Sequence, residues 1–535
     1  MVDKPVDIMP GDVQRILGRD AQRSNILAAR MIADIIKTTL GPKGMDKMLV
    51  SPTNDITITN DGVTILEEME IEHPAAKMMV EIAKAQESEV GDGTTTAVML
   101  AGKLLENAEK LLDQKIHPTV IAKGYSIAAE RSKDILKEIS LRVTPEDEEI
   151  LKKIAMTAMT GKSAEEAKEK LSKVIVEAIK QITESGKVDL ENIKIIGVKK
   201  DGIENTELVK GIVIEKEKVS HDMPTRIRDA RIALIDFPIE IKNPEIETRI
   251  SVTTPEQLQN FISEEEEIIK GMVEKIKKSG ANVLFCQKGV DDFAQYLLSK
   301  EKIYVCRRVS RSDLEKISKA TGGRIISNLN ELTMFELGKA EVVEEVKNGE
   351  NVFTYIRGCH NPKAVTILVY GGSDHVLEEV KRAIRDGLGD VACVVESGLV
   401  VPGGGAVEIE VSKRLREFSQ LLTGREQLAV EEFASALEFI PATLAENAGL
   451  DPIDILTELK SRHDSGERNA GLNLLTNKIE NVFESKIIEP LKIKTQAISS
   501  ATEVAIMILR IDDIILAKGK EKTEKKNEKD RDEEI

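Results

Sequence analysis

The sequence predicts a multidomain protein of mixed α and α/β class, in which both ends of the chain contribute to one mainly helical domain. Its 535 residues exceed what a single hydrophobic core holds, so we expect about two to four domains. Helical periodicity dominates roughly the first 140 residues and returns after Gly371-Gly372. Between Ala281 and Ser327, short strands alternate with short helices. This order indicates that an α/β domain is inserted into a domain built from both termini.

The N-terminal part is predicted to be helical except for one hairpin. Apolar residues recur at helical spacing from Ser24 to Leu40, where Gly41-Pro42 ends the run. The alternation of apolar and polar residues from Ile56 to Ile65, around Asn60-Asp61-Gly62, predicts a hairpin turn at those three residues. Further helices are predicted at residues 75–90, 94–112 and 118–139, and two more between residues 145 and 186.

The middle of the chain is expected to hold an α/β unit and one long helix. Strands are predicted at residues 212–214, 232–235, 283–286, 303–306, 325–326 and 365–369. The predicted helix Pro255–Ser279 carries an apolar stripe, which includes Phe261 and Ile269, opposite an acidic run at Glu264–Glu267. Such a stripe most commonly packs on the helix's own sheet. The alternative is that the helix extends away and docks on a neighbouring subunit.

The C-terminal part returns to helices around a glycine-rich turn at Pro402–Gly405. A last helix is predicted at Thr495–Ile508, followed by a β-like run at Leu509–Leu516. From Lys518 to Ile535 only mixed charges remain, which predicts a disordered tail.

Composition excludes several classes of protein. The net charge of −17 argues against a nucleic-acid binder, which needs a basic face. Cys286, Cys306, Cys359 and Cys393 lie far apart, which indicates neither a zinc site nor a disulfide framework but small buried side chains in a reducing compartment. The N-terminus lacks the apolar core of a signal peptide, and no apolar run reaches membrane-spanning length. We therefore expect an intracellular, soluble protein without a membrane span.

The run from Gly91 to Thr96, Gly-Asp-Gly-Thr-Thr-Thr, precedes a helix-forming segment. Two glycines allow close approach of a ligand, and a helix N-terminus favours anions. Asp92 would repel a phosphate directly, but Mg²⁺ between the two would attract both. The run therefore predicts a magnesium–nucleotide site. A helix start capped by threonine is an equally good interpretation of this run alone.

Four glycine-bearing loops offer backbone amides to phosphate: Leu40–Gly44, Gly91–Thr96, Thr160–Lys162 and Gly403–Gly405. None has the P-loop pattern, which disfavours an ordinary P-loop ATPase. Asp61 fits a turn for conformational reasons alone. Asp386 and Asp390 are four residues apart and share a helical face, which usually means a solvated acidic surface. Spacing alone does not bring Asp61, Asp92 and Asp386 together.

Several motifs together resemble the chaperonin family. They are Thr39-Leu-Gly-Pro-Lys-Gly-Met-Asp-Lys-Met-Leu49, Asn60-Asp-Gly-Val-Thr-Ile65, Gly91–Thr96 and Pro402–Gly405, in the family's order. Lys494-Thr-Gln-Ala-Ile498 and Arg510-Ile-Asp-Asp513 are similar to the group II branch, which comprises the archaeal thermosome and the eukaryotic cytosolic chaperonin. The helix Pro255–Ser279 matches that branch's built-in lid. The resemblance covers the chain except its charged tail.

The resemblance implies a three-domain subunit. Residues 1–145 and 404–517 would form an equatorial ATP-binding domain, and residues 146–214 and 370–403 an intermediate hinge domain. Residues 215–369 would form an apical substrate-binding domain with a lid helix at about residues 245–279, and residues 518–535 the disordered tail.

The resemblance also implies roles for single residues. The metal and the attacking water would be held by carboxylates: Asp92 on Mg²⁺, with Asp61 and Asp386, and Asp390 as a further candidate, acting on the water. Leu40, Gly41 and Pro42 would line the nucleotide. The phosphates would be bound by Gly93, Thr94, Thr95 and Thr96, and the terminal phosphate would be sensed by Gly161 and Lys162. The nucleoside end would be formed by Gly404, Gly405, Gly471, Asn473 and Glu489.

The implied activity is that of an ATP-dependent chaperone. Identical or sister subunits would stack in two rings, enclose unfolded polypeptide under a lid, and use ATP and Mg²⁺ to drive folding in the cytoplasm. Two alternatives remain open from the residues: a small-molecule phosphotransferase built on the same loops, and a ring-forming scaffold with vestigial nucleotide sites. The three intact carboxylates Asp61, Asp92 and Asp386 argue against the scaffold.

Overall fold

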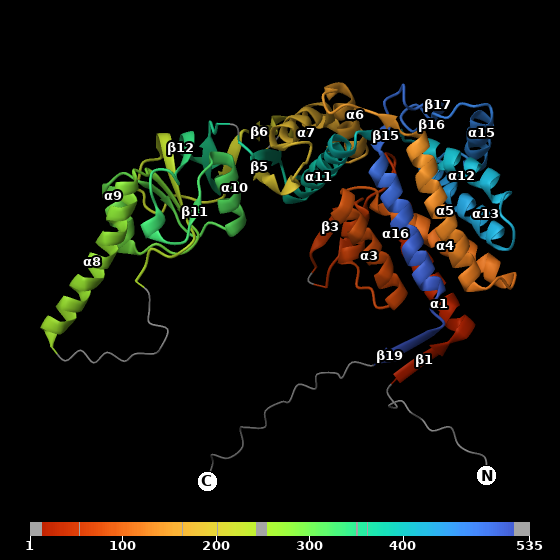
Figure 1. Ribbon diagram of the computed structural model, residues 1–535, viewed down its shortest axis with the longest axis horizontal. Coiled ribbons are helices and arrows are strands. Elements are labelled where there is room, and N and C mark those ends of the chain that lie inside the picture. Colours follow the sequence, from red (N-terminus) through yellow and green to blue (C-terminus); the bar gives the residue numbers. More distant parts are fainter. Residues whose placement is uncertain are drawn as a thin grey trace, which may run out of the picture.

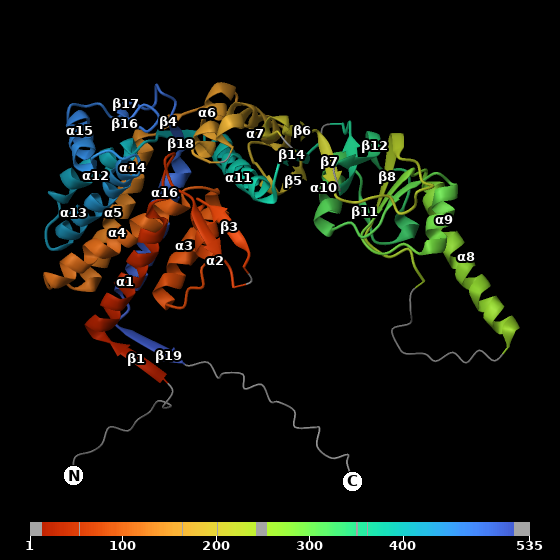
Figure 2. The same cartoon turned by 180° about the vertical axis from the view of Figure 1, so that it is seen from behind.

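The computed structural model describes residues 13–52, 54–162, 164–200, 202–241, 254–348, 351–360 and 362–517. The predicted charged tail and the first part of the predicted lid element, residues 245–253, lie outside the described residues. Three bodies follow one another in Figures 1 and 2, and each has its own buried apolar side chains. The structure confirms the predicted mixed α and α/β class.

The first body is a helical bundle built from both ends of the chain. One core of buried side chains runs through residues 26–136 and 401–509. In Figure 1 the red and orange N-terminal helices lie beside the blue C-terminal ones. The bundle contains α1 (Gly18–Lys37), α2 (Gly62–Glu68), α3 (Pro74–Val90), α4 (Thr94–Asp113), α5 (Pro118–Ile139), α12 (Ala406–Ser419), α13 (Glu426–Leu437), α14 (Phe439–Asn447), α15 (Pro452–Asp464) and α16 (Leu491–Leu509).

Two short β-ribbons lie at the surface of this bundle. Strand β1 (Val13–Leu17) pairs antiparallel with β19 (Asp513–Ala517), so the two ends of the described chain meet. Strand β2 (Lys47–Val50) pairs antiparallel with β3 (Ile56–Thr59). A third pair, β16 (Ala470–Asn473) with β17 (Lys478–Asn481), lies beside α15.

The predicted hairpin turn at Asn60-Asp61-Gly62 is wrong. The partner of β3 is the preceding strand β2, and the three residues lead into α2 instead. The Asp61 side chain accepts a hydrogen bond from the backbone N–H of Thr64, which makes it the N-cap of α2. Aspartate before glycine suits both a turn and a helix cap, so the local pattern did not separate them.

The second body connects the bundle to the rest of the chain. Helices α6 (Glu148–Met159), α7 (Lys168–Ile182) and α11 (Asp374–Ser397) share one core. They pack with a sheet in which β14 (Val365–Gly371) lies between β5 (Ile193–Lys199), parallel, and β6 (Glu207–Val209), antiparallel. A sheet of β4 (Leu141–Arg142), β15 (Leu399–Pro402) and β18 (Ile488–Pro490) ties it to the bundle.

The third body is an α/β unit around a seven-stranded sheet. The strand order is β10-β9-β8-β12-β13-β7, and β11 pairs with β8. Apolar clusters include residues of this sheet together with helices α8 (Pro255–Ser279), α9 (Asp292–Lys300) and α10 (Arg311–Thr321). The strands are β7 (Gly211–Ile214), β8 (Arg226–Ile235), β9 (Val283–Cys286), β10 (Tyr304–Cys306), β11 (Ile325–Ile326), β12 (Gly338–Asn348) and β13 (Asn351–Arg357). The predicted strands here are confirmed, whereas β12 and β13 were not predicted.

Helix α8 projects from the end of the third body, and its two halves differ (Figure 2). Ile269, Val273 and Ile276 are buried in the core beside the sheet. Phe261 and Ile262, nearer the N-terminal end, are 41% and 48% exposed. The common interpretation of the stripe, packing on the helix's own domain, therefore holds for the C-terminal half, and the N-terminal half carries exposed apolar side chains.

Across the part of the chain that the structure describes, none of the helices combines the length and apolar character needed to span a bilayer.

Candidate active site

A cavity of about 260 Å³ lies where the first and second bodies meet. Its walls come from the turn before α2, the N-terminus of α4, the end of α6, the glycine loop after β15, β16, β18 and the start of α16. Most of the predicted site residues line it: Leu40, Gly41, Pro42, Asp61, Asp92, Gly93, Thr94, Thr95, Thr96, Gly161, Lys162, Asp390, Gly404, Gly405, Asn473 and Glu489. Asp386 and Gly471 do not line it.

The N-terminus of α4 points its free amides into this cavity. Gly91 and Gly93 adopt left-handed conformations, with φ of +85° and +80°. A Cβ on Gly93 would lie 2.6 Å from Cγ2 of Ile493, so glycine is needed for space as well. The buried Gln86 side chain donates to the carbonyl of Asp92 at 2.9 Å and fixes the loop. Unpaired N–H groups and the helix dipole make this end suited to an anion.

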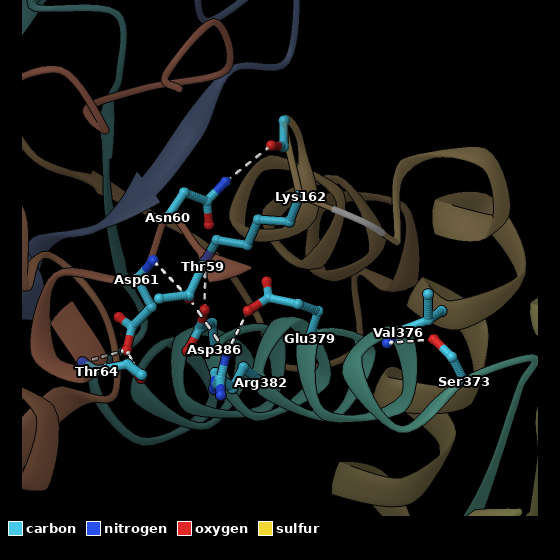
Figure 3. A network of polar contacts seen from close by, with 11 residues as sticks. Thr59, Asn60, Asp61, Thr64, Lys162, Ser373, Val376, Glu379, Arg382 and Asp386 are labelled. Atoms are coloured by element: carbon cyan, nitrogen blue, oxygen red, sulfur yellow. Dashed lines mark hydrogen bonds and ion pairs between the residues drawn. The ribbon is translucent and has the colours of Figure 1, made fainter. Parts of the chain in front are cut away.

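Three loops from distant parts of the chain converge beside α4. A Cβ on Gly161 would lie 2.5 Å from Cα of Pro42, so these two backbones are in close contact. The Asn60 side chain donates a hydrogen bond to the carbonyl of Gly161 at 3.2 Å (Figure 3). These contacts hold the loop that carries Lys162 against the loop that carries Asp61.

Lys162 forms an ion pair with Asp386 of α11 (Figure 3). The Asp386 side chain is mostly buried, and this burial raises its pKa to about 7 even though the ammonium opposes the rise. Burial acts to lower the pKa of Lys162, but Asp386, Asp92 and Asp61 overcome it and raise the pKa. Lys162 is therefore a cation influenced by three carboxylates, and it lines the cavity whereas its partner Asp386 does not.

Asp390 lies one helical turn beyond Asp386 and is 2% exposed. A Cβ on Gly389 would lie 2.7 Å from the carbonyl oxygen of Val90, so glycine lets α11 approach the Gly91 loop. Burial, reinforced by Asp92 and Asp386, raises the pKa of Asp390. The shared helical face was predicted correctly, but its interpretation as a solvated acidic surface is wrong because both carboxylates are buried.

One carboxylate oxygen of Asp61 is held by two hydrogen bonds from Thr64. Oδ2 accepts hydrogen bonds from the N–H of Thr64 at 2.9 Å and from its hydroxyl at 2.6 Å. This contact caps α2 and fixes the carboxylate at the cavity wall. The side chain is thus held in one orientation, which is what positioning a small molecule such as water requires.

The other end of the cavity is formed by the glycine loop after β15 and by β16. Gly404 and Gly405 adopt left-handed conformations, and the N–H of Leu472 donates to the carbonyl of Gly404 at 2.9 Å. This bond fastens the glycine loop to β16, which contributes Asn473 to the lining. Gly471 lies behind this wall, where a Cβ would lie 3.0 Å from the carbonyl oxygen of Gly403.

Several cavity residues were not among the predicted ones. Thr39, Asn60, Thr160 and Lys494 line the cavity. Each lies inside or directly beside a motif already recognised in the sequence. Their position next to these motifs could have predicted that they line the cavity. Glu87 is different: burial, with Asp386, Asp61 and Asp92, raises its pKa to about 8. It lies inside α3, and no local pattern distinguishes it from a surface glutamate.

The donor set suits a magnesium ion shared with phosphate. Among the described residues no group of three or more His, Cys, Asp or Glu side chains is arranged to hold a metal alone. Mg²⁺ usually takes one or two carboxylates and completes its shell with phosphate oxygens and water. Asp92 and Asp390 line the same cavity, and Oδ1 of Asp390 is buried with no hydrogen-bond partner in the described part of the chain. The residues present therefore fit the ion.

Comparison with known proteins gives matches along nearly the whole chain. The TCP-1/cpn60 chaperonin family matches residues 32–519. Thermosome subunit beta of Archaeoglobus fulgidus is 56% identical over 523 residues, 97% of this chain and 96% of the relative. Thermosome subunit alpha of the same organism is 55% identical over 522 residues, 97% and 96% of the two chains. The thermosome subunit of Methanopyrus kandleri is 55% identical over 519 residues, 96% and 95% of the two chains. The resemblance carried by the motifs is confirmed, and the chain belongs to the TCP-1/cpn60 chaperonin family.

Proposed function

We propose that this chaperonin subunit binds Mg-ATP in the cavity, hydrolyses it, and uses hydrolysis to time the enclosure and release of unfolded polypeptide. The observation that carries the proposal is the meeting of two bodies at the phosphate end. Asp61 and Asp92 belong to the helical bundle, whereas Lys162 and Asp386 belong to the second body. A site divided in this way is complete only when the two bodies are close, which couples chemistry to domain movement.

The proposed roles follow from the chemistry of each wall. The amides and hydroxyls at Gly93–Thr96 bind phosphate oxygens, and Lys162 binds the terminal phosphate. Asp92, with Asp390 beside it, would hold Mg²⁺, which would supply neutralisation of the phosphate charge. Asp61 and Asp386 orient the attacking water and accept its proton. Phosphoryl transfer needs chiefly positioning and charge stabilisation, so this set suffices.

The proposed domain division follows the three bodies. Residues 1–145 and 404–517 would be equatorial, residues 146–214 and 370–403 intermediate, and residues 215–369 apical, apart from two strands at the boundaries. Strand β7 (Gly211–Ile214) pairs in the sheet of the third body, and β14 (Val365–Gly371) pairs in the sheet of the second. The separate cores of buried side chains support this division. The apical assignment makes α8 part of a lid, which its projecting, exposed N-terminal half favours.

The β-ribbons support assembly into rings. Met48 and Val50 of β2 and Ile56 and Ile58 of β3 are exposed apolar side chains on a two-stranded ribbon. An open strand edge with apolar side chains is suited to pairing with another chain. The relatives in Archaeoglobus fulgidus are alpha and beta subunits. We therefore propose partners that are identical or sister subunits, in two stacked rings in the cytoplasm, with unfolded polypeptide as client and no nucleic acid.

Electron microscopy of the purified protein with and without Mg-ATP tests the proposal. We expect double rings whose ends close when nucleotide is hydrolysed. A monomer or dimer with ATP-dependent transfer to a small molecule would support the phosphotransferase alternative instead. Rings that neither bind nor hydrolyse ATP would support the scaffold alternative.

A further inference from the structure

Lys494 lies between two carboxylates at the nucleoside end of the cavity. Its Nζ is 2.9 Å from Oε1 of Glu408 and 2.6 Å from Oε2 of Glu489. Glu408 comes from the first turn of α12, Glu489 from β18, and Lys494 from the first turn of α16. These three elements frame the nucleoside end, and Lys494 and Glu489 line the cavity itself. The ion cluster therefore fixes the walls of this end to one another.

The position of Lys494 is unfavourable for an ammonium group on its own. Its side chain is 11% exposed, that of Glu408 is 4% exposed, and a buried charge is costly unless it is paired. The N-terminus of α16 also carries the positive end of the helix dipole, which disfavours a cation. The two carboxylates offset both effects. We therefore look for the role of Lys494 in its effect on the two carboxylates, Glu408 and Glu489.

Lys494 leaves one oxygen of Glu489 available. Oε1 lies beside the glycine loop, where a Cβ on Gly403 would be 2.6 Å from it. Burial raises the pKa of Glu489, and the Lys494 ammonium opposes that rise and so favours the carboxylate. An ionised carboxylate only accepts hydrogen bonds, so a phosphate cannot be its partner. A hydroxyl group can, and a nucleotide carries hydroxyls on its sugar.

We propose that Lys494 is a positioning residue that makes the site selective for ribonucleotides, because it holds Glu489 with Oε1 ready to accept a hydrogen bond from a sugar hydroxyl. The inference rests on the proposed ATP site and adds a basis for discrimination against deoxy-sugar nucleotides. The two-carboxylate arrangement matters because Glu408 anchors Lys494 from the side away from Glu489.

The experiment measures steady-state hydrolysis of ATP, 2′-deoxy-ATP and 3′-deoxy-ATP by assembled wild-type protein and by variants. The wild type should show a KM for at least one deoxy analogue about tenfold above that for ATP, the size expected for one hydrogen bond to a charged group. The double variant Lys494→Met with Glu408→Gln removes the ammonium without leaving Glu408 as a buried unpaired charge. It should lose the discrimination through a raised KM for ATP, with kcat retained.

Two further variants separate positioning from folding. Lys494→Gln puts a shorter, neutral amide in place of the ammonium that pairs with both carboxylates. It should weaken the discrimination, which provides a second test if the double variant does not assemble. Lys492→Met removes a lysine from the same turn of α16, outside the cavity lining, and should keep the wild-type ratio. A wild type that hydrolyses ATP without discrimination, or a Lys494 variant that keeps it, would overturn the inference. A wild type that hydrolyses none of the three nucleotides would instead overturn the proposed function.

Discussion

Lys162 and Asp386, which are 224 residues apart in the sequence, form an ion pair in which Lys162 lines the cavity and Asp386 does not. Both partners belong to the second body, on the loop after α6 and on α11. A terminal phosphate bound at the α4 N-terminus carries more charge than one carboxylate and would compete for the ammonium. With the roles proposed above, the pair would link occupancy of the phosphate end to the release of Asp386 as a base.

Replacing Asp386 with Asn should separate nucleotide binding from turnover. We expect ATP to bind with little change, because Asp386 does not line the cavity. Loss of a general base should lower kcat by at least about 100-fold. Nucleotide titration and single-turnover hydrolysis measure the two quantities. Asp374→Asn, at the exposed start of the same helix, is the matched control and should hydrolyse normally. Normal turnover by Asp386→Asn would remove this residue from the mechanism.

The raised pKa of Asp386, about 7, predicts how hydrolysis depends on pH. A carboxylate acts as a base only when ionised, and it becomes protonated as the pH falls through its pKa. The kcat/KM for Mg-ATP, which reports ionisation of the free enzyme, should therefore fall as the pH is lowered from 8 toward 6, with a midpoint about 7. The residual rate of Asp386→Asn should lack this limb. An identical limb in the variant would assign the titration to another group.

Gly161 should tolerate no side chain, because two effects coincide there. Its φ is +80°, which costs a residue with a Cβ roughly 1–2 kcal/mol, and the Cβ would lie 2.5 Å from backbone Cα of Pro42. We expect Gly161→Ala to displace the adjacent Lys162 and to lower ATP hydrolysis markedly. Gly186→Ala is the control, since φ is +78° with no atom within 4 Å of the Cβ. Equal effects of the two substitutions on hydrolysis would contradict a role for the Pro42 contact.

The sequence predicted those elements whose residues carry a local signal. Helices α4, α5 and α8 and strands β9 and β11 have strong periodicity or aliphatic runs, and their bounds agree with the prediction within one residue. Strand β12 is rich in charged residues, and it is a strand because it pairs with β13 and with β8. Its stability comes from tertiary pairing rather than from local preference.

The site was predictable as motifs but not as an assembly. A glycine-rich loop indicates that another part of the backbone comes close to it. The sequence does not show which part, because the partner is far away along the chain: Pro42 for Gly161 and Val90 for Gly389. Burial was the hardest property to predict, because the four-residue spacing of Asp386 and Asp390 occurs on solvated and on buried helix faces alike. The position of Lys494 between two carboxylates could be recognised only in the folded structure, where Glu408 and Glu489 lie on either side of its ammonium group in the ion cluster.

The exposed half of α8 should be needed for enclosure but not for chemistry. Phe261 and Ile262 are exposed, whereas Ile269 and Val273 belong to the core, so a deletion across residues 264–275 would damage folding as well as any lid. The sharper change is Phe261→Ser with Ile262→Ser. ATP hydrolysis should persist, because the cavity lies in other bodies. A substrate trapped in the presence of ATP should become accessible to protease. Unfolding temperature provides the control for folding, and undiminished protection of the trapped substrate would contradict the lid assignment.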